Sequence, residues 1–160
     1  MDTSVLIALG KLGCLGLLPK LLDDVLIAGA VMEEVGGDET YTEVERLVGR
    51  GLAHVSEVSN LELVELLSST LGRGEAEAIA LALDLDLVLL DDLKARKAAR
   101  RLGVRVMGTL GVLRLLMDAG YVRESPEELC RALVGQGFWV DVGLCHKILG
   151  HDKSVRVSGS

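Results

Sequence analysis

The chain has 160 residues, a length that suits one compact domain with a sizeable core. Hydrophobic residues make up 49% and charged residues 26%, which excludes a disordered chain. Only 2% of the residues are aromatic, which excludes modules that stack bases on aromatic side chains. The formal charge of −7 argues against a protein that binds nucleic acid through bulk positive potential.

The most apolar stretch, residues 5–22, is interrupted by Lys11, Pro19 and Lys20. A membrane-spanning helix needs about 20 nearly uninterrupted apolar residues, so we expect a buried core segment and no contact with a membrane. The N-terminus also lacks the basic leader and the small-residue cleavage site of a secretory signal.

The three cysteines, Cys14, Cys130 and Cys145, are far apart and form no CxxC pair. This pattern suggests neither a disulfide framework nor a zinc site. We therefore expect reduced core thiols in a cytoplasmic protein.

Taken in chain order, the sequence predicts helices that alternate with short strands. The segments with helical periodicity are 4–12, 15–22, 31–35, 41–48, 61–71, 75–83, 94–102, 109–119, 126–134 and 142–149. The segments that favour strands are 25–28, 53–58, 87–90 and 104–107, and 138–140 is a short extended piece. The alternation indicates an α/β fold with a parallel sheet covered on both faces, in one domain over 1–150 with a polar tail over 151–160.

Asp91 and Asp92 directly follow the apolar strand 87–90. Ligands of parallel α/β sheets bind at the carboxyl ends of the strands, so these acids are candidates for a site. The alternative is that one of them caps the helix that follows.

Three other acids occupy positions that suit the same site. Glu75 lies in the first turn of an apolar helix, where the alternative is an interaction with the helix dipole. Glu77 is expected on another, solvated face of that helix. Glu34 follows the strand 25–28, with Glu33 as a surface acid, and Asp2 precedes the first apolar run, where it is also a plain N-cap candidate.

Carboxylates from distant segments repel one another at close range and raise each other's pKa. A divalent cation removes that repulsion, and ligands that offer only oxygen atoms select hard ions such as Mg²⁺ or Mn²⁺. Such ions bind phosphate oxygens and activate water, an arrangement that serves phosphodiester hydrolysis.

Five short motifs, in this order, resemble the PIN-domain family, closest to a prokaryotic subgroup of the VapC-like ribonuclease superfamily. They are Asp2-Thr3-Ser4, Glu33-Glu34-Val35, Gly-Glu-Ala-Glu-Ala-Ile at 74–79, Asp-Asp-x-x-Ala-Arg at 91–96 and Gly-Thr-Leu-Gly-Val-Leu at 108–113. The resemblance covers nearly the whole chain, from Asp2 to about Leu149.

The resemblance implies a three-layer α/β/α fold with a central, mainly parallel sheet. It also implies a Mg²⁺- or Mn²⁺-dependent endoribonuclease that leaves a 5′-phosphate and a 3′-hydroxyl. Many relatives are toxins held inactive by an antitoxin protein, and a homodimer is expected. Carried over residue by residue, the catalytic and metal-binding acids are Asp2, Glu34, Glu75 and Asp92, with Asp91 as the less certain neighbour.

The first motif departs from the family pattern. In the family, the first acid ends a buried strand, whereas only Met1 precedes Asp2 here. Either the chain begins late or the central strand is reduced to a stub, and we expect Asp2 on a mobile terminus close to the charged α-amino group.

A block of seven basic residues and no acids lies between Lys94 and Met117, so the rest of the chain carries a charge of −14. Because the block follows Asp91 and Asp92, we expect a surface that tracks RNA phosphates, with Lys94, Arg96, Lys97 and Thr109 as substrate-binding residues. The alternatives are a solvated helix face paired with nearby acids and, for Thr109, a helix N-cap.

Two other functions compete with the nuclease. A catalytically inactive PIN-like interaction module would work through a partner, and the short N-terminus favours it. A haloacid-dehalogenase-like phosphatase requires a DxD motif after the first strand, and Asp2-Thr3-Ser4 lacks the second acid. The glycine pattern matches no phosphate-binding loop.

Overall fold

The computed structural model of the chain describes residues 1–150, so the predicted polar tail over 151–160 lies outside the described residues. The contacts divide the chain into two compact units, Met1–Thr109 and the residues from Leu110 onward. Each unit is described by itself below.

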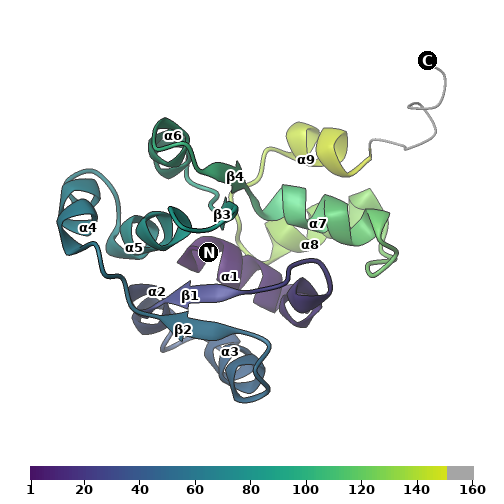
Figure 1. The fold of residues 1–160 in the computed structure, drawn as a ribbon. Coiled ribbons are helices and arrows are strands. Elements are labelled where there is room, and N and C mark those ends of the chain that lie inside the picture. Colours follow the sequence, from purple (N-terminus) through teal and green to yellow (C-terminus); the bar gives the residue numbers. More distant parts are fainter. Residues whose placement is uncertain (151–160) are drawn as a thin grey trace, which may run out of the picture. The chain divides into compact units, whose positions relative to one another are not determined.

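The first unit contains most of the regular structure (Figure 1). Its elements are α1 (Thr3–Lys11), the 3₁₀ helix η1 (Leu15–Lys20), β1 (Leu26–Ala28), α2 (Gly29–Glu34), α3 (Thr40–Gly49), β2 (His54–Ser56), α4 (Leu61–Ser68), α5 (Arg73–Ala82), β3 (Leu87–Leu89), α6 (Leu93–Arg101) and β4 (Arg105–Met107). α7 (Thr109–Asp118) starts at the last residue of this unit, and α8 (Pro126–Gly135) and α9 (Val142–Leu149) follow in the second.

The predicted helices and strands are present, with ends shifted by a few residues. The second predicted helix differs in type, because it is a 3₁₀ helix of six residues with Pro19 inside it. Proline has no backbone N–H to donate, which favours a short, tight segment over a continued α-helix.

The four strands form two parallel pairs within the described residues. β1 pairs with β2, with Leu26 opposite His54, and β3 pairs with β4, with Leu87 opposite Arg105. The prediction of an α/β fold with parallel strand pairing is confirmed, whereas among the described residues the strands form two separate two-stranded sheets, so one sheet covered on both faces stays a prediction.

Met1 and Asp2 lie between the two strand pairs (Figure 1). The α-amino group of Met1 donates a hydrogen bond to the Leu26 carbonyl at 3.2 Å, and the Asp2 N–H donates to the Leu89 carbonyl at 3.0 Å. Both residues are buried. The expectation of a mobile Asp2 is therefore wrong, because the facing edges of β1 and β3 supply backbone partners that hold the first two residues.

An apolar cluster fixes the segment that ends in Asp91 and Asp92. The buried side chains of α5, β3, α6 and their connections pack together in it: Leu71, Ala78, Ile79, Ala82, Val88, Leu90, Ala95, Ala99 and Val104. The small alanine side chains let the helices pack close to the strand, and the fully buried Leu90 fixes the point at which the chain leaves the core.

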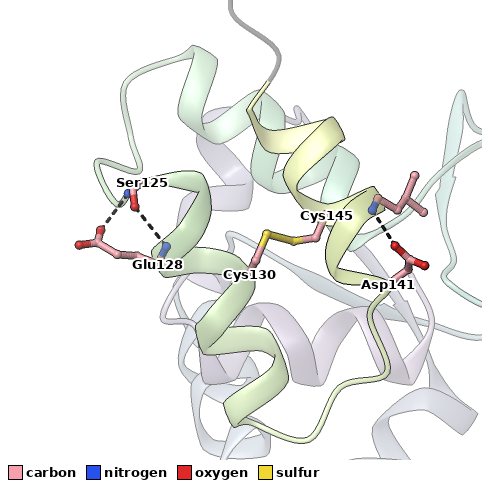
Figure 2. Close-up of a disulfide and its surroundings, with 6 residues drawn as sticks. Ser125, Glu128, Cys130, Asp141 and Cys145 are labelled. Atoms are coloured by element: carbon pink, nitrogen blue, oxygen red, sulfur yellow. Dashed lines mark hydrogen bonds between the residues drawn. A yellow bond between two sulfur atoms is a disulfide. The ribbon is translucent and has the colours of Figure 1, made fainter.

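In the second unit, α8 and α9 are joined by a disulfide between Cys130 and Cys145 (Figure 2). The expectation that these two cysteines are reduced thiols is wrong, because the helical hairpin brings residues 15 positions apart to a Cα–Cα distance of 6.0 Å. Cys14 is buried and is not part of this disulfide, as expected.

Both helices of this hairpin begin with a side-chain cap (Figure 2). At α8, Ser125 and Glu128 form a capping box, and at α9 the Asp141 carboxylate accepts from the Leu144 N–H at 2.7 Å. Within residues 1–150, no helix has both the length and the apolar character needed to cross a bilayer.

Removal of the disulfide is expected to destabilise the second unit by about 3 kcal/mol, because the bond closes a loop of 15 residues in the unfolded chain. The test compares thermal unfolding of the oxidised protein with that of the Cys130→Ser/Cys145→Ser variant. Reductant is expected to lower the melting temperature of the wild type and to leave that of the double variant unchanged. Equal effects of reductant on both proteins would contradict the assignment.

Candidate functional site

Asp2 is the most deeply buried acid of the predicted set, with 1% of its surface exposed. It is the N-cap of α1, and its Oδ1 accepts a hydrogen bond from the Val5 N–H at 3.0 Å. Burial raises the pKa of Asp2 to about 6, and the charges of Asp91 and Glu75 act in the same direction. Asp2 therefore lies within electrostatic reach of two other predicted acids.

Glu34, the last residue of α2, reaches across to the start of α5. Its Oε1 accepts from the Gly74 N–H at 3.1 Å, and the Thr3 hydroxyl donates to its Oε2. A Cβ at position 74 would lie 2.7 Å from a Glu34 oxygen, so a side chain there would displace the Glu34 carboxylate from this position. The interaction favours Glu34 over Glu33 as the site acid.

Glu75 lies in the first turn of α5 and is half-buried. Its Oε2 accepts from the Gly72 N–H at 3.1 Å, so it also completes the start of its own helix. Partial burial raises the pKa of Glu75, and the charges of Asp92 and Glu34 raise it further.

Asp91 and Asp92 differ in how their carboxylates are used. Asp92 is the N-cap of α6, and its Oδ1 accepts from the Ala95 N–H at 2.9 Å, so the predicted capping role is present. Asp91 binds Thr109 with both oxygens, because it accepts from the Thr109 N–H at 2.8 Å and from its hydroxyl at 2.6 Å. Thr109 is thus already engaged by a protein carboxylate.

These contacts connect all five acids through their charges. Asp2 is influenced by Asp91 and Glu75, and Glu75 by Asp92 and Glu34. Burial is the main cause of the raised pKa values of Asp2 and Glu75, and the neighbouring carboxylates add a smaller repulsion that a cation would relieve. An all-oxygen donor set of this kind suits a hard divalent cation.

The side chains do not form a completed metal-binding cluster as they stand. Over residues 1–150, no group of three or more His, Cys, Asp or Glu side chains is arranged to hold a metal ion. One oxygen of Asp2, of Glu75 and of Asp92 accepts from a backbone N–H at a helix start, and the second oxygen does not take part in that bond.

The basic residues of α6 are largely exposed and follow Asp92 directly. Within residues 1–150, no ion pair is formed by Lys94, Lys97, Arg100 or Arg101. The alternative prediction, that these bases pair with nearby acids, is therefore not observed. Arg96 differs, because its Nε is buried without a hydrogen-bond partner in this part of the chain. That atom is shielded from solvent and is poorly placed to contact a substrate.

Glu77 is the residue that sequence reasoning misplaced. It was expected on a solvated face, yet only 8% of its surface is exposed. Its Oε2 accepts from the Ala30 N–H at 2.9 Å, and its Oε1 from the Arg73 Nε at 3.1 Å. Its burial follows from the packing of α2 against α5, which the periodicity of α5 alone does not reveal.

Sequence reasoning also missed Thr3, whose hydroxyl donates to Glu34. The available signal was its position directly after Asp2, which places it beside the predicted acids at the start of α1.

A comparison with protein families matches residues 1–154 to a family model described as PIN domain. The chain belongs to the PIN-domain family. PIN domains are generally nucleases and typically use divalent metal ions. A comparison with curated proteins and with solved structures gives no match.

In metal-free buffer, Asp2→Asn is expected to stabilise this PIN domain more at pH 7 than at pH 4. An acid with a pKa near 6 when folded and about 3.8 when unfolded favours folding most below pH 4, and this contribution falls as the pH rises to 6. The shift corresponds to about 3 kcal/mol, and asparagine remains a good N-cap.

The measurement is urea unfolding of both proteins with EDTA at pH 4 to 7. Burial lowers the pKa of the Met1 α-amino group to about 6, which adds an opposite trend above pH 6 to both proteins, so the two are compared with each other at each pH. A stability difference between Asp2→Asn and the wild type that does not change with pH would contradict the raised pKa of Asp2.

Proposed function

We propose that this PIN domain is a metal-dependent endoribonuclease with Asp2, Glu34, Glu75 and Asp92 as its catalytic, metal-binding acids. The observation that carries the proposal is the electrostatic link among these acids, which come from the starts of three helices and the end of a fourth. The proposal includes the three-layer fold with a central sheet, for which the bridging position of Met1 and Asp2 between the two strand pairs is the support.

The cation and the side chains of the protein would contribute different parts of the chemistry. A bound Mg²⁺ or Mn²⁺ supplies a water of lowered pKa and positive charge against the scissile phosphate. The free oxygens of Asp2, Glu75 and Asp92 would hold the ion, and their second oxygens stay fixed to helix N–H groups. Glu34 is oriented by Thr3 and Gly74.

Asp91 fits a positioning role better than a ligand role. Both of its oxygens accept hydrogen bonds from Thr109, which ties the segment after β3 to the first residue of α7. Thr109 accordingly takes part in the site through Asp91, and contact between its hydroxyl and a phosphate would require this pair to separate.

The exposed bases of α6 fit the sugar–phosphate backbone of RNA. Lys94 and Lys97 lie one turn apart at the start of the helix that Asp92 caps, so they present positive charge next to the acids. This local charge resolves the conflict between a nucleic-acid enzyme and an acidic chain.

The wider biological role is proposed from the resemblance. It comprises a toxin of a toxin–antitoxin pair, an antitoxin protein as partner, a homodimer, and the cytoplasm of a prokaryotic cell. The disulfide removes one of the observations behind the cytoplasmic location, because such bonds are rare in that compartment.

An inactive PIN-like interaction module is the second candidate. It is favoured by the fact that the acids within residues 1–150 already serve as caps and form no completed metal cluster. The two functions differ in whether the wild-type chain cleaves RNA when Mn²⁺ is supplied.

Glu75→Gln and Asp92→Asn are each expected to reduce Mn²⁺-dependent RNA cleavage at least 100-fold, because each removes a charge that holds the cation and leaves a cap acceptor in place. The measurement is the single-turnover cleavage rate on a defined RNA, with circular dichroism to verify folding. Glu33→Gln, next to the site acid of α2 and exposed, is the matched control. Undiminished cleavage by both folded variants would overturn the assignment.

Lys94→Gln/Lys97→Gln is expected to weaken RNA binding and to lower the slope of log affinity against log salt by about 1.4, because about 0.7 counterions are released per phosphate contact on a single strand. Binding is measured with EDTA present, so that cleavage does not interfere. Arg46→Gln/Arg50→Gln removes two exposed charges of the α3 region and is expected to leave the slope unchanged. Equal slopes for the two double variants would remove α6 from the substrate surface.

A further inference from the structure

Glu77 is a buried acid that lies close in sequence to the candidate site acid Glu75 and forms its contacts with another helix. It lies on α5 two residues beyond Glu75, and its carboxylate faces α2. It is not among the charges that raise the pKa of Asp2 or Glu75. Its contact with α2 therefore indicates a structural role.

The first turn of α2 depends on this carboxylate. The helix has only six residues, and its N-cap, Ala28, has no side chain that accepts a hydrogen bond. Helices of this length are not stable by themselves, and their first N–H groups need partners. Oε2 of Glu77 supplies one for Ala30 at 2.9 Å, from a residue 47 positions away.

A second contact runs between the same two helices in the opposite sense. Glu34 of α2 accepts from the Gly74 N–H in the first turn of α5, whereas Glu77 of α5 accepts from the Ala30 N–H in the first turn of α2. Each helix thus contributes a carboxylate to the start of the other. Two bonds at separate points fix both the spacing of the helices and their register.

The register decides where Glu34 lies. Ala30 and Glu34 are four residues apart and occupy one face of α2, so a shift at Ala30 moves Glu34 by a similar amount. Glu34 fits tightly against residue 74, where a Cβ would approach its oxygens to 2.7 and 2.9 Å. A loosened first turn would therefore separate Glu34 from Gly74 and from Glu75.

We propose that Glu77 is a positioning residue, which anchors the first turn of α2 so that Glu34 is held beside Glu75. The catalytic consequence rests on the proposed function, whereas the positioning itself is a property of the metal-free chain. The ion pair with Arg73 is secondary, since the Arg73 side chain is 71% exposed and the pair spans a single turn of α5.

The test follows hydrogen exchange of the Ala30 and Gly74 amides in metal-free protein by NMR. Glu77→Ala is expected to speed exchange at both amides at least tenfold. The effect at Gly74 is indirect, because the Gly74 N–H donates to Glu34 and not to Glu77. Glu77→Gln, which keeps a carbonyl oxygen for the Ala30 N–H, and Arg73→Ala, which keeps the whole carboxylate, are expected to stay within threefold of the wild type. Should Glu77→Ala not fold, Glu77→Asp carries the same expectation, because its reach is one methylene shorter.

The same variants are then titrated with Mn²⁺ and assayed on RNA. Glu77→Ala is expected to bind Mn²⁺ at least tenfold more weakly and to lose kcat, with KM for RNA within twofold, whereas Glu77→Gln rescues both. Unchanged Gly74 exchange in folded Glu77→Ala, or equal losses in Glu77→Ala and Glu77→Gln, would overturn the proposal. Absence of Mn²⁺ binding by the wild type would instead refute the proposed function, and the exchange data would still decide the positioning role.

Discussion

Hydrogen bonds from backbone N–H groups to carboxylates are the interaction on which the arrangement of this PIN domain depends. At the start of α1 and of α6, the N-cap acids Asp2 and Asp92 accept from an N–H of the helix, and at the start of α5 Glu75 accepts from the N–H of the N-cap residue Gly72. The N-cap of α2, Ala28, has no side chain that accepts a hydrogen bond, and Glu77 of α5 accepts from the Ala30 N–H instead. These bonds satisfy helix starts and, at the same time, fix acids next to one another.

This arrangement has an electrostatic cost. Burial and neighbouring charges raise the pKa of Asp2 to about 6 and raise that of Glu75. The grouping of Asp2, Glu34, Glu75 and Asp92 in one region supports the cation site proposed above, and the exposed bases of α6 support a phosphate-bearing substrate.

Much of the fold was predictable because its signals are local. The apolar run 87–90 followed by two aspartates predicts a buried strand and a capped helix, and both are present as β3 and α6. The helix predicted over 126–134 is likewise present as α8. The order of the motifs predicted the site acids Asp2, Glu34, Glu75 and Asp92. Only the tertiary structure reveals the effect of these charges on one another's pKa.

The failures concern contacts between distant segments. Glu77 was expected in solvent because the pattern of α5 does not show that α2 packs over it, and the disulfide was missed because neither spacing nor motif pairs Cys130 with Cys145. Asp2 was expected to be mobile because no strand precedes it, whereas the edges of β1 and β3 hold the first two residues through backbone bonds. Each case depends on a partner more than 10 positions away.

The most direct test of the central claim is to measure the melting temperature of the wild-type protein as Mn²⁺ is added, at pH 7 and at pH 5. Mutual repulsion of the acids predicts that the melting temperature rises and saturates at pH 7, because a ligand that binds only the folded state stabilises it. The rise is expected to shrink at pH 5, where Asp2, with a pKa of about 6, is mostly protonated. A melting temperature that does not respond to Mn²⁺ at pH 7 would contradict the account.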